Sequence, residues 1–321
     1  MEEQETKLSS ALALFAAAFF WGTTFVAQSL GAGNVGTFTF LTLRSFLGTA
    51  LVLLVILFRA KVLRRKAPAG PEHNTGKPRQ TKDVSPVLKA GLCCGICLFL
   101  ASALQQYGIE LYVADADAGG TAKSSFITAM YVVIVPILSI FTGKKPAGRV
   151  WLAVFFCVAG LYLLCLSDGL SFSRGDIFEI LCALGFSVQI MTVDRFSGRV
   201  DGLSLSAAEF FVTGVFSLIC MLLLEHPEWA SVQKAMPAVL YAAVFSNSIA
   251  YTCQIYGQKG VKPALASMIM CLESVVGVLS GVIVLHEELS IRQISGCVLM
   301  FSALLLAELK VGKKQTAASQ E

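Results

Sequence analysis

263-PALASMIMCLESVVGVLSGVIVL-285 is the stretch of sequence that decides the fold. It carries a single charged side chain, Glu273, near its centre. A helix of about 20 apolar residues is what crosses the hydrocarbon core of a membrane. A membrane-spanning β-strand would instead show about ten residues that alternate between apolar and polar. The stretch therefore predicts a transmembrane helix with one carboxyl group in its middle.

Nine further apolar runs of similar character occupy most of the remaining chain. Hydrophobic residues make up 55% of the protein and charged residues only 14%, whereas soluble domains are roughly a quarter charged. Lipid must therefore cover most of the outer surface, and we predict an all-α integral membrane protein with ten transmembrane helices. The expected spans are residues 8–29, 37–58, 86–107, 119–141, 150–166, 176–196, 206–224, 236–256, 263–285 and 291–309. Pro136 is expected to kink the fourth span and Pro237 to start the eighth.

The spans divide into two halves of five, residues 8–167 and 175–310. Leu104–Ile109 and Cys253–Gln258 share a Gln, a Tyr and a Gly at a spacing of 149 positions. This match is short, but five is an odd number, so equivalent spans must cross the membrane in opposite directions. The sequence therefore predicts two inverted five-helix repeats, an arrangement that many secondary transporters use.

Basic residues give the orientation of the bundle. Of the 25 Lys and Arg residues, 19 fall at one set of span ends and three at the other. Loops rich in Lys and Arg stay in the cytoplasm, so both termini, a basic loop at 59–85 and a tail at 311–321 are expected to be cytoplasmic. The net charge of +4 is small and lies in the loops, so no nucleic-acid partner is predicted.

The chain lacks the motifs of an enzyme or a metalloprotein. Gly31, Gly33 and Gly36 match GxGxxG, but a dinucleotide site needs a preceding strand, and here an apolar span precedes it; we interpret the pattern as a tight turn. The Cys residues read as small apolar helix residues, and the three His are scattered. We therefore predict no enzyme, no metal and no cofactor.

Ionisable residues within spans are costly and usually functional. Glu273 either binds a cation, a coupling proton or substrate, or makes a structural bond to a neighbouring helix. Arg44 is expected to pair with a carboxylate or a helix end rather than with substrate, and Lys123 either snorkels to the interface or attracts an anion. Glu179 and Glu209 are expected to be solvated, because they lie close to predicted span ends.

Several motifs resemble the drug/metabolite transporter superfamily, specifically its EamA-type members. The resembling pieces are Ala17–Phe25, Leu43–Leu47 and Ala129–Ser139 in the first half, and Leu272–Gly277, His286–Ser290 and Gln293–Gly296 in the second. Many members have Pro after the Glu of the ninth span, where this chain has Ser274, so a kink there is in doubt. The resemblance covers nearly the whole chain apart from the tails and the 59–85 loop.

The resemblance implies a cavity between the two halves, lined mainly by spans one, three, four, six, eight and nine. The cavity residues expected on this basis are Trp21, Gln105, Ser125, Gln189, Asn247 and Glu273. Residues expected to gate the cavity or support it are Arg44, Gln106, Tyr107, Lys123, Tyr131, Gln254 and Tyr256.

The predicted function is secondary transport of a small metabolite or drug-like solute by alternating access, with export as the direction. The expected partners are that solute, a coupling proton or cation, and the lipid of a cell membrane such as the bacterial inner membrane. The alternative is a membrane scaffold or accessory subunit that transports nothing itself. The sequence does not choose between a monomer and a homodimer.

Overall fold

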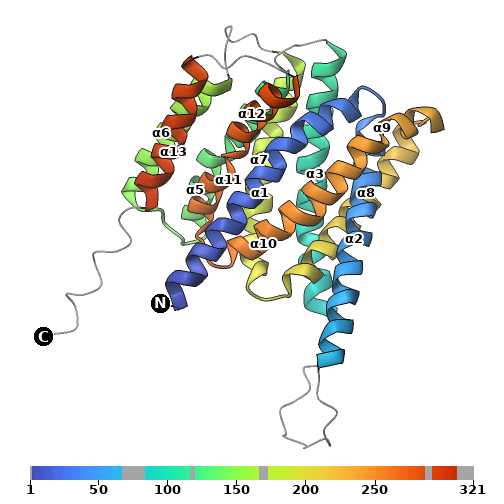
Figure 1. Cartoon of the computed structure of the whole chain (residues 1–321), viewed down its shortest axis with the longest axis horizontal. Coiled ribbons are helices and arrows are strands. Elements are labelled where there is room, and N and C mark those ends of the chain that lie inside the picture. The colour runs from blue at the N-terminus through green and yellow to red at the C-terminus, as the bar shows by residue number, and fades with distance from the viewer. Residues whose placement is uncertain (1, 67–83, 116–119, 166–172, 286–290, 309–321) are drawn as a thin grey trace, which may run out of the picture.

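The computed structural model describes residues 2–66, 84–115, 120–165, 173–285 and 291–308, and these form an all-helical bundle (Figure 1). The first half contains α1 (Glu2–Ala32), α2 (Thr37–Lys66), α3 (Val84–Ala114), α4 (Gly120–Ala129), α5 (Tyr131–Phe141) and α6 (Gly148–Cys165). The second contains α7 (Arg174–Ser197), α8 (Gly202–Leu224), α9 (Trp229–Tyr241), the π-helical segment η1 (Ala242–Tyr251), α10 (Thr252–Gln258), α11 (Pro263–Met270), α12 (Glu273–Leu285) and α13 (Ile291–Glu308).

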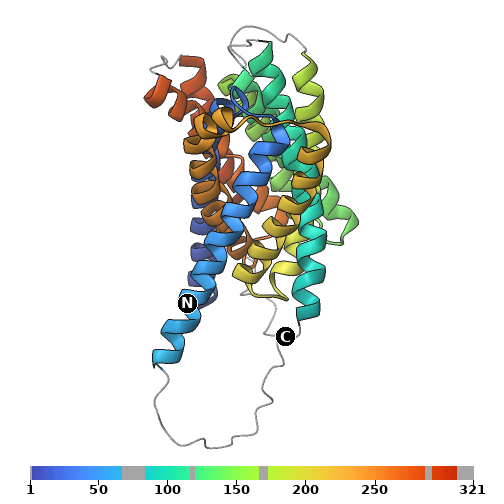
Figure 2. The same ribbon diagram turned by 90° about the vertical axis from the view of Figure 1, so that its right-hand side faces the viewer.

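These segments make ten spans, because α4 continues into α5, α9 into η1 and α10, and α11 into α12. Eight spans are long and apolar enough to cross a membrane, and the other two contain the shorter apolar helices Gly148–Leu163 and Ile294–Leu306. The prediction of a ten-helix membrane protein is confirmed. We call the side where α1 begins the terminal side and the other the far side. α2 extends beyond the bundle on the terminal side (Figure 2).

The contacts between helices follow the two repeats. α7 packs along α3 in the same way that α1 packs along the chain of α9, η1 and α10. α2 packs against its counterpart α8, and α6 against its counterpart α13 at the edge of the bundle (Figure 1). Each repeat therefore completes its packing with helices of the other, and the bundle has a pseudo-twofold arrangement.

The fourth and ninth spans are each interrupted near mid-membrane. The break between α4 and α5 falls at Met130, six residues before Pro136, which lies inside α5. The break between α11 and α12 falls at Cys271 and Leu272, although Ser274 stands where relatives were expected to carry Pro. Since Pro136 lies beyond the first break and Pro is absent from the second, proline produces neither break. Discontinuous helices at the middle of a transporter expose backbone groups to its binding site.

The eighth span starts earlier than expected. α9 begins at Trp229, so Pro237 lies inside the helix rather than at its start, and that prediction was wrong. The next ten residues, Ala242–Tyr251, form a π-helix, in which each turn contains an extra residue. The hydroxyl of Ser248 donates to the carbonyl of Ala243 in this segment (2.8 Å). Such a widened turn shifts the helix face that continues into α10.

Two carboxylates cap the N-terminus of α2 on the far side. Glu225 accepts hydrogen bonds from the backbone N–H groups of Phe38 and Thr39 (2.7 Å each) and from the Thr39 hydroxyl (2.6 Å). Glu110 accepts from the N–H (3.0 Å) and the hydroxyl of Thr37 (2.6 Å). The GxGxxG pattern lies in the turn just before this cap. These carboxylates satisfy helix-end donors that lipid cannot bond.

We expect Glu225→Ala to lower the free energy of unfolding by about 2 kcal/mol, because it leaves two helix-end N–H groups without an acceptor. Chemical denaturation in detergent micelles, followed by circular dichroism, measures the change. Glu228→Ala is the matched control, since Glu228 is exposed and makes no side-chain cap bond. Equal stability of the two variants would show that the cap contributes little.

Candidate functional site

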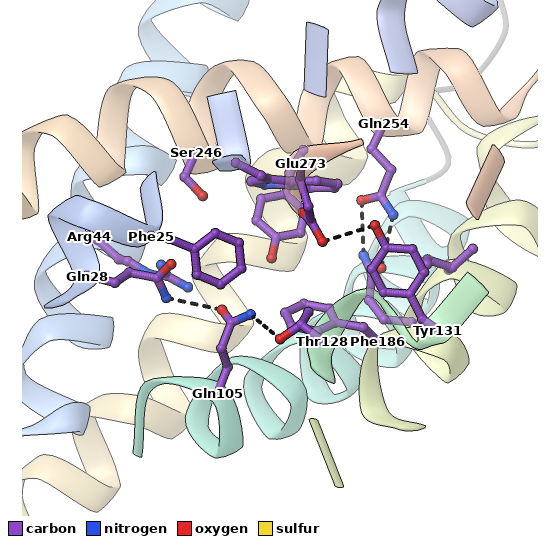
Figure 3. A pocket seen from close by; sticks show the side chains of 14 residues that line it. Phe25, Gln28, Arg44, Gln105, Thr128, Tyr131, Phe186, Ser246, Gln254 and Glu273 are labelled. Carbon is purple, nitrogen blue, oxygen red and sulfur yellow. Dashed lines mark hydrogen bonds between the residues drawn. The ribbon is translucent and has the colours of Figure 1, made fainter. Parts of the chain in front are cut away.

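A polar cavity lies between the two repeats at the level of the helix breaks (Figure 3). About 30 Å³ of it is open to the centres of water molecules, which is room for about two waters. Its lining comprises Trp21, Phe25, Gln28, Arg44, Gln105, Thr128, Tyr131, Phe186, Gln189, Ile190, Ser246, Tyr251, Gln254 and Glu273. Both repeats contribute, and most of the polar lining residues lie deep inside spans.

Tyr131 and Glu273 form the centre of the site. Each is the first residue after the break in its span, so the two occupy equivalent positions in the inverted repeats. The Tyr131 hydroxyl donates to Oε1 of Glu273 (3.0 Å). Gly22 on α1 allows the approach: a Cβ there would lie 2.5 Å from the Glu273 carbonyl oxygen. The breaks thus bring a carboxyl group and a phenol together at mid-membrane.

On the far side of this pair, amide and hydroxyl groups join α1, α3 and α4. Gln28 donates from Nε2 to the side-chain oxygens of Gln105 and Gln106 (3.1 Å each). Gln105 in turn donates to the Thr128 hydroxyl (3.1 Å). Because these bonds cross three spans, they close the far side of the cavity.

A second polar cluster lies on the terminal side and joins α7, α8 and α10. Gln189 and Gln254 exchange amide hydrogen bonds (3.1 and 3.4 Å), and Gln189 also donates to Oε1 of Glu209 (2.9 Å). Gln254 corresponds to Gln105 in the 149-residue spacing of the repeats. The cavity therefore has an amide cluster at each end, and two of the three spans in one cluster are equivalent to two in the other: α1 to α7, and α3 to the span that contains α10.

Arg44 reaches the cavity from α2 without a carboxylate partner among the described residues. Its side chain is 3% exposed, its Nε has no hydrogen-bond partner, and its guanidinium lies 5.8 Å from the centre of the Phe40 ring. Figure 3 places it well apart from Glu273, toward the other end of the cavity. Trp21 Nε1 is likewise buried without a partner. The expected pairing of Arg44 with a carboxylate is not observed.

The structure brings together four of the six residues expected to line the cavity: Trp21, Gln105, Gln189 and Glu273. Ser125 is buried beside it, where its carbonyl accepts from the Ser274 hydroxyl (2.9 Å). Asn247 is buried between η1 and α2, where its amide donates to the Arg44 carbonyl (3.4 Å). Neither of these two belongs to the lining, because each is directed into a helix–helix contact.

Of the residues expected to gate or support the cavity, three line it: Arg44, Tyr131 and Gln254. Gln106 is buried behind Gln105 and donates to the Gln28 carbonyl (3.3 Å). Tyr107 is 40% exposed and packs on Phe178 outside the cavity. Lys123 lies 5.9 Å from the Tyr112 ring, and Tyr256 lies under Lys259 near the terminal side. These last three are remote from the site.

Sequence reasoning missed two buried carboxyl groups. Glu179 and Glu209 are each 0% exposed, so the expectation that they are solvated was wrong. For Glu209 the reason is a boundary: α8 begins at Gly202, four residues before the predicted span, which places Glu209 two turns inside the helix. For Glu179 the signal was its spacing from Asp176, the third residue of α7, which forms a capping box with Ser173 and sets Glu179 one turn deeper. Lining residues with no sequence signal include Thr128, Phe186, Ser246 and Tyr251.

A larger hollow lies elsewhere, between α2, η1 and the start of α8. It measures about 630 Å³ and is lined mainly by apolar side chains, among them Leu51, Val55, Phe58 and Ile249. Apolar walls suit lipid chains rather than a polar solute. The small central cavity, with its charged and amide groups, is therefore the better candidate for a functional site.

Ten helices in two inverted repeats around a polar central cavity define a membrane transporter architecture. The chain belongs to the EamA-like transporter family, whose model matches residues 8–166 and 173–309.

Curated relatives agree with this family membership. An uncharacterized transporter of Archaeoglobus fulgidus is 26% identical over 315 residues, which cover 95% of this chain and 87% of that protein. The uncharacterized transporter YwfM of Bacillus subtilis (strain 168) is 26% identical over 306 residues, 94% of each chain. A solved crystal structure superposes with a TM-score of 0.73 at 22% identity, over 94% of this chain and 96% of that one, which shows the same fold.

We expect Gly22→Ala to destabilise the protein by about 1–3 kcal/mol, because the added methyl group would push α1 away from α12 at Glu273. Thermal unfolding in detergent measures the effect. Gly198→Ala is the control, since a Cβ on Gly198 would meet no atom within 4 Å. If Gly22→Ala unfolds at the same temperature as Gly198→Ala, the close contact between these helices is not needed.

Proposed function

We propose that the protein is a secondary transporter that exports a small solute carrying both a positive and a negative charge, by alternating access to the central cavity. A solute of this kind, such as an amino acid, presents an anionic group to Arg44 and a cationic group to Glu273. The observation that carries the proposal is that both residues are buried in one cavity and neither has an ion-pair partner in the described part of the chain.

Unpaired charges are expensive at this depth. Insertion scales assign about 2.5–3.5 kcal/mol to an Arg or Asp at the centre of a membrane helix. A protein that keeps two such groups, opposite in sign and separated from each other, keeps a site that a dipolar solute would neutralise. The unpaired N–H groups of Arg44 and Trp21 supply donors for the anionic end. Glu273 accepts one hydrogen bond from the Tyr131 phenol, and its remaining acceptor capacity suits the cationic end.

The two amide clusters support the alternating part of the proposal. One crosses α1, α3 and α4 on the far side, and the other crosses α7, α8 and α10 on the terminal side. In an inverted repeat, opening one cluster while the other stays closed produces two mirror-related states. A cavity of about 30 Å³ is smaller than an amino acid, so one cluster must open to admit the solute.

Counterflow in proteoliposomes tests the solute class. We expect exchange of labelled zwitterionic amino acids, and at least about tenfold slower exchange of analogues that lack the amino or the carboxyl group, because a lost charge-assisted bond is worth about 1.5–3 kcal/mol. Glu273→Gln should remove selectivity for the amino group and Arg44→Gln that for the carboxyl group. Glu228→Gln, at an exposed position, should behave as wild type. Absence of exchange across a broad metabolite panel would favour a scaffold without transport of its own.

Thiol labelling tests whether the cavity opens to each side. A cysteine at Ser246, in the lining, should react with a membrane-impermeant reagent from both sides in turn, as mass spectrometry of the labelled peptide would report. A cysteine at the adjacent Asn247, held between η1 and α2, is the matched control and should stay protected. Protection of both positions from both sides would contradict alternating access.

A further inference from the structure

Glu179 is a buried carboxyl group that the proposed solute site does not use. It is the sixth residue of α7, in the far-side third of the bundle, and is 0% exposed. Ser124 donates to its Oε1 (2.7 Å) and Thr128 to its Oε2 (2.9 Å). Gly108 on α3 leaves room for the carboxyl group of Glu179, since a Cβ on Gly108 would lie 2.9 Å from Oε1. Hydroxyls from α4 thus hold both oxygens of one carboxyl group.

The ionisable groups around Glu179 do not neutralise it. On its own helix these are Asp176, which is a nearby negative charge, and Cys182. From α3, the Tyr112 hydroxyl donates to Asp176, and the Tyr107 ring packs on Phe178 beside Glu179. From α4, Lys123 lies 5.9 Å from the Tyr112 ring. α5 brings Tyr131, which is bonded to Glu273.

The remaining helices packed on α7 add no charge near Glu179. α11 contains no ionisable residue, and α10 contacts the opposite end of α7, around Gln189 and Ile190. Among the described residues Glu179 has no salt bridge. A carboxyl group buried in this way is stabilised when it binds a proton.

A directed chain of hydrogen bonds joins Glu179 to the cavity. Gln28 donates to Gln105, Gln105 donates to Thr128, and Thr128 donates to Glu179. Every donor points toward the carboxylate, and Thr128 and Gln105 are both lining residues. The direction of the last bond, from Thr128 to Glu179, therefore depends on Glu179 acting as an acceptor.

We propose that Glu179 is the binding site for a coupling proton, separate from the solute site and linked to it through Thr128. The proposal adds to the transport function above. Proton binding at Glu179 does not depend on that function, and only its coupling to transport rests on it. A hydronium ion from the far-side solution gives its proton to Oε2, so one O–H bond of hydronium breaks, one O–H bond forms on the carboxyl group, and water is left. The new O–H is a donor facing the Thr128 hydroxyl, so the Thr128 hydrogen must turn away, and Sγ of Cys182, at 3.7 Å, can accept it. The Thr128 oxygen then accepts from Glu179 as well as from Gln105, which changes the bond that ties Gln105 to α4. Proton binding therefore alters the far-side closure of the cavity.

Two spectroscopic measurements on purified protein in lipid nanodiscs test this without any solute. Infrared difference spectroscopy follows the C=O band of a protonated carboxyl group during a pH titration. Fluorescence follows Trp21 in a background with Trp151→Phe and Trp229→Phe, which leaves Trp21 as the single tryptophan. We expect the band to disappear and the Trp21 emission to change over the same pH range. Glu179→Gln should abolish both changes, and Glu228→Gln should preserve both.

Thr128→Val provides a second test should Glu179→Gln not fold. It should keep the infrared titration and lose the Trp21 response, and Thr128→Ser should restore that response. The proposal is overturned if Glu273→Gln or Glu209→Gln removes the band while Glu179→Gln keeps it. It is also overturned if Trp21 still responds in Thr128→Val, or if NaCl, but not choline chloride, removes the band at constant pH. Neither measurement involves a solute, so the spectroscopic result does not depend on whether the counterflow assay succeeds.

Discussion

Lipid offers no hydrogen-bond partner, and this constraint organises the molecule. Every polar group within a span must find its partner inside the protein or face a cavity. The cap on α2 shows the rule at the membrane edge, where Glu225 reaches from another span to two backbone N–H groups. The amide clusters show it at depth, where Gln28 bonds to Gln105 in the first repeat and Gln189 bonds to Gln254 in the second. Two of the buried polar atoms that stay unpaired in the described part of the chain, the Nε of Arg44 and the Nε1 of Trp21, lie in residues of one small cavity.

The same constraint explains how much of the fold could be predicted. Apolar runs long enough to span a membrane are visible directly in composition, so the ten spans and their two halves follow from the sequence. The interior of a span is harder, because a break such as that at Met130 comes from packing between repeats and not from a local residue like Pro136. The π-helix at Ala242–Tyr251 likewise carries no local signal in its sequence.

The candidate site was predictable to the extent that residue type and depth suffice. Glu273 and Gln189 are polar residues deep within predicted spans, and both line the cavity. Gln105, near the predicted end of the third span, was expected there from the family resemblance and lines the cavity too. Asn247 has the same type and depth but faces α2, because the π-helical turn rotates its side chain away from the lining. Glu209 was misplaced because an error of one turn in a helix boundary changes a solvated carboxylate into a buried one. Glu179 was misplaced because it is buried by its contacts with Ser124 and Thr128 of α4, which its position in the span does not reveal.

One asymmetry between the repeats bears on how such a carrier would favour a direction. Arg44 is the eighth residue of α2 and Glu209 the eighth residue of α8, so the inverted repeats carry a cation toward the far side and a carboxyl group toward the terminal side. The helix arrangements of the two access states are mirror-related, but the distributions of charged groups are not. In the proposed cycle the anionic group of the solute meets Arg44, whereas the equivalent place toward the terminal side carries the carboxyl group of Glu209. A solute with both charges would therefore be held in a different orientation, and with a different affinity, in each state.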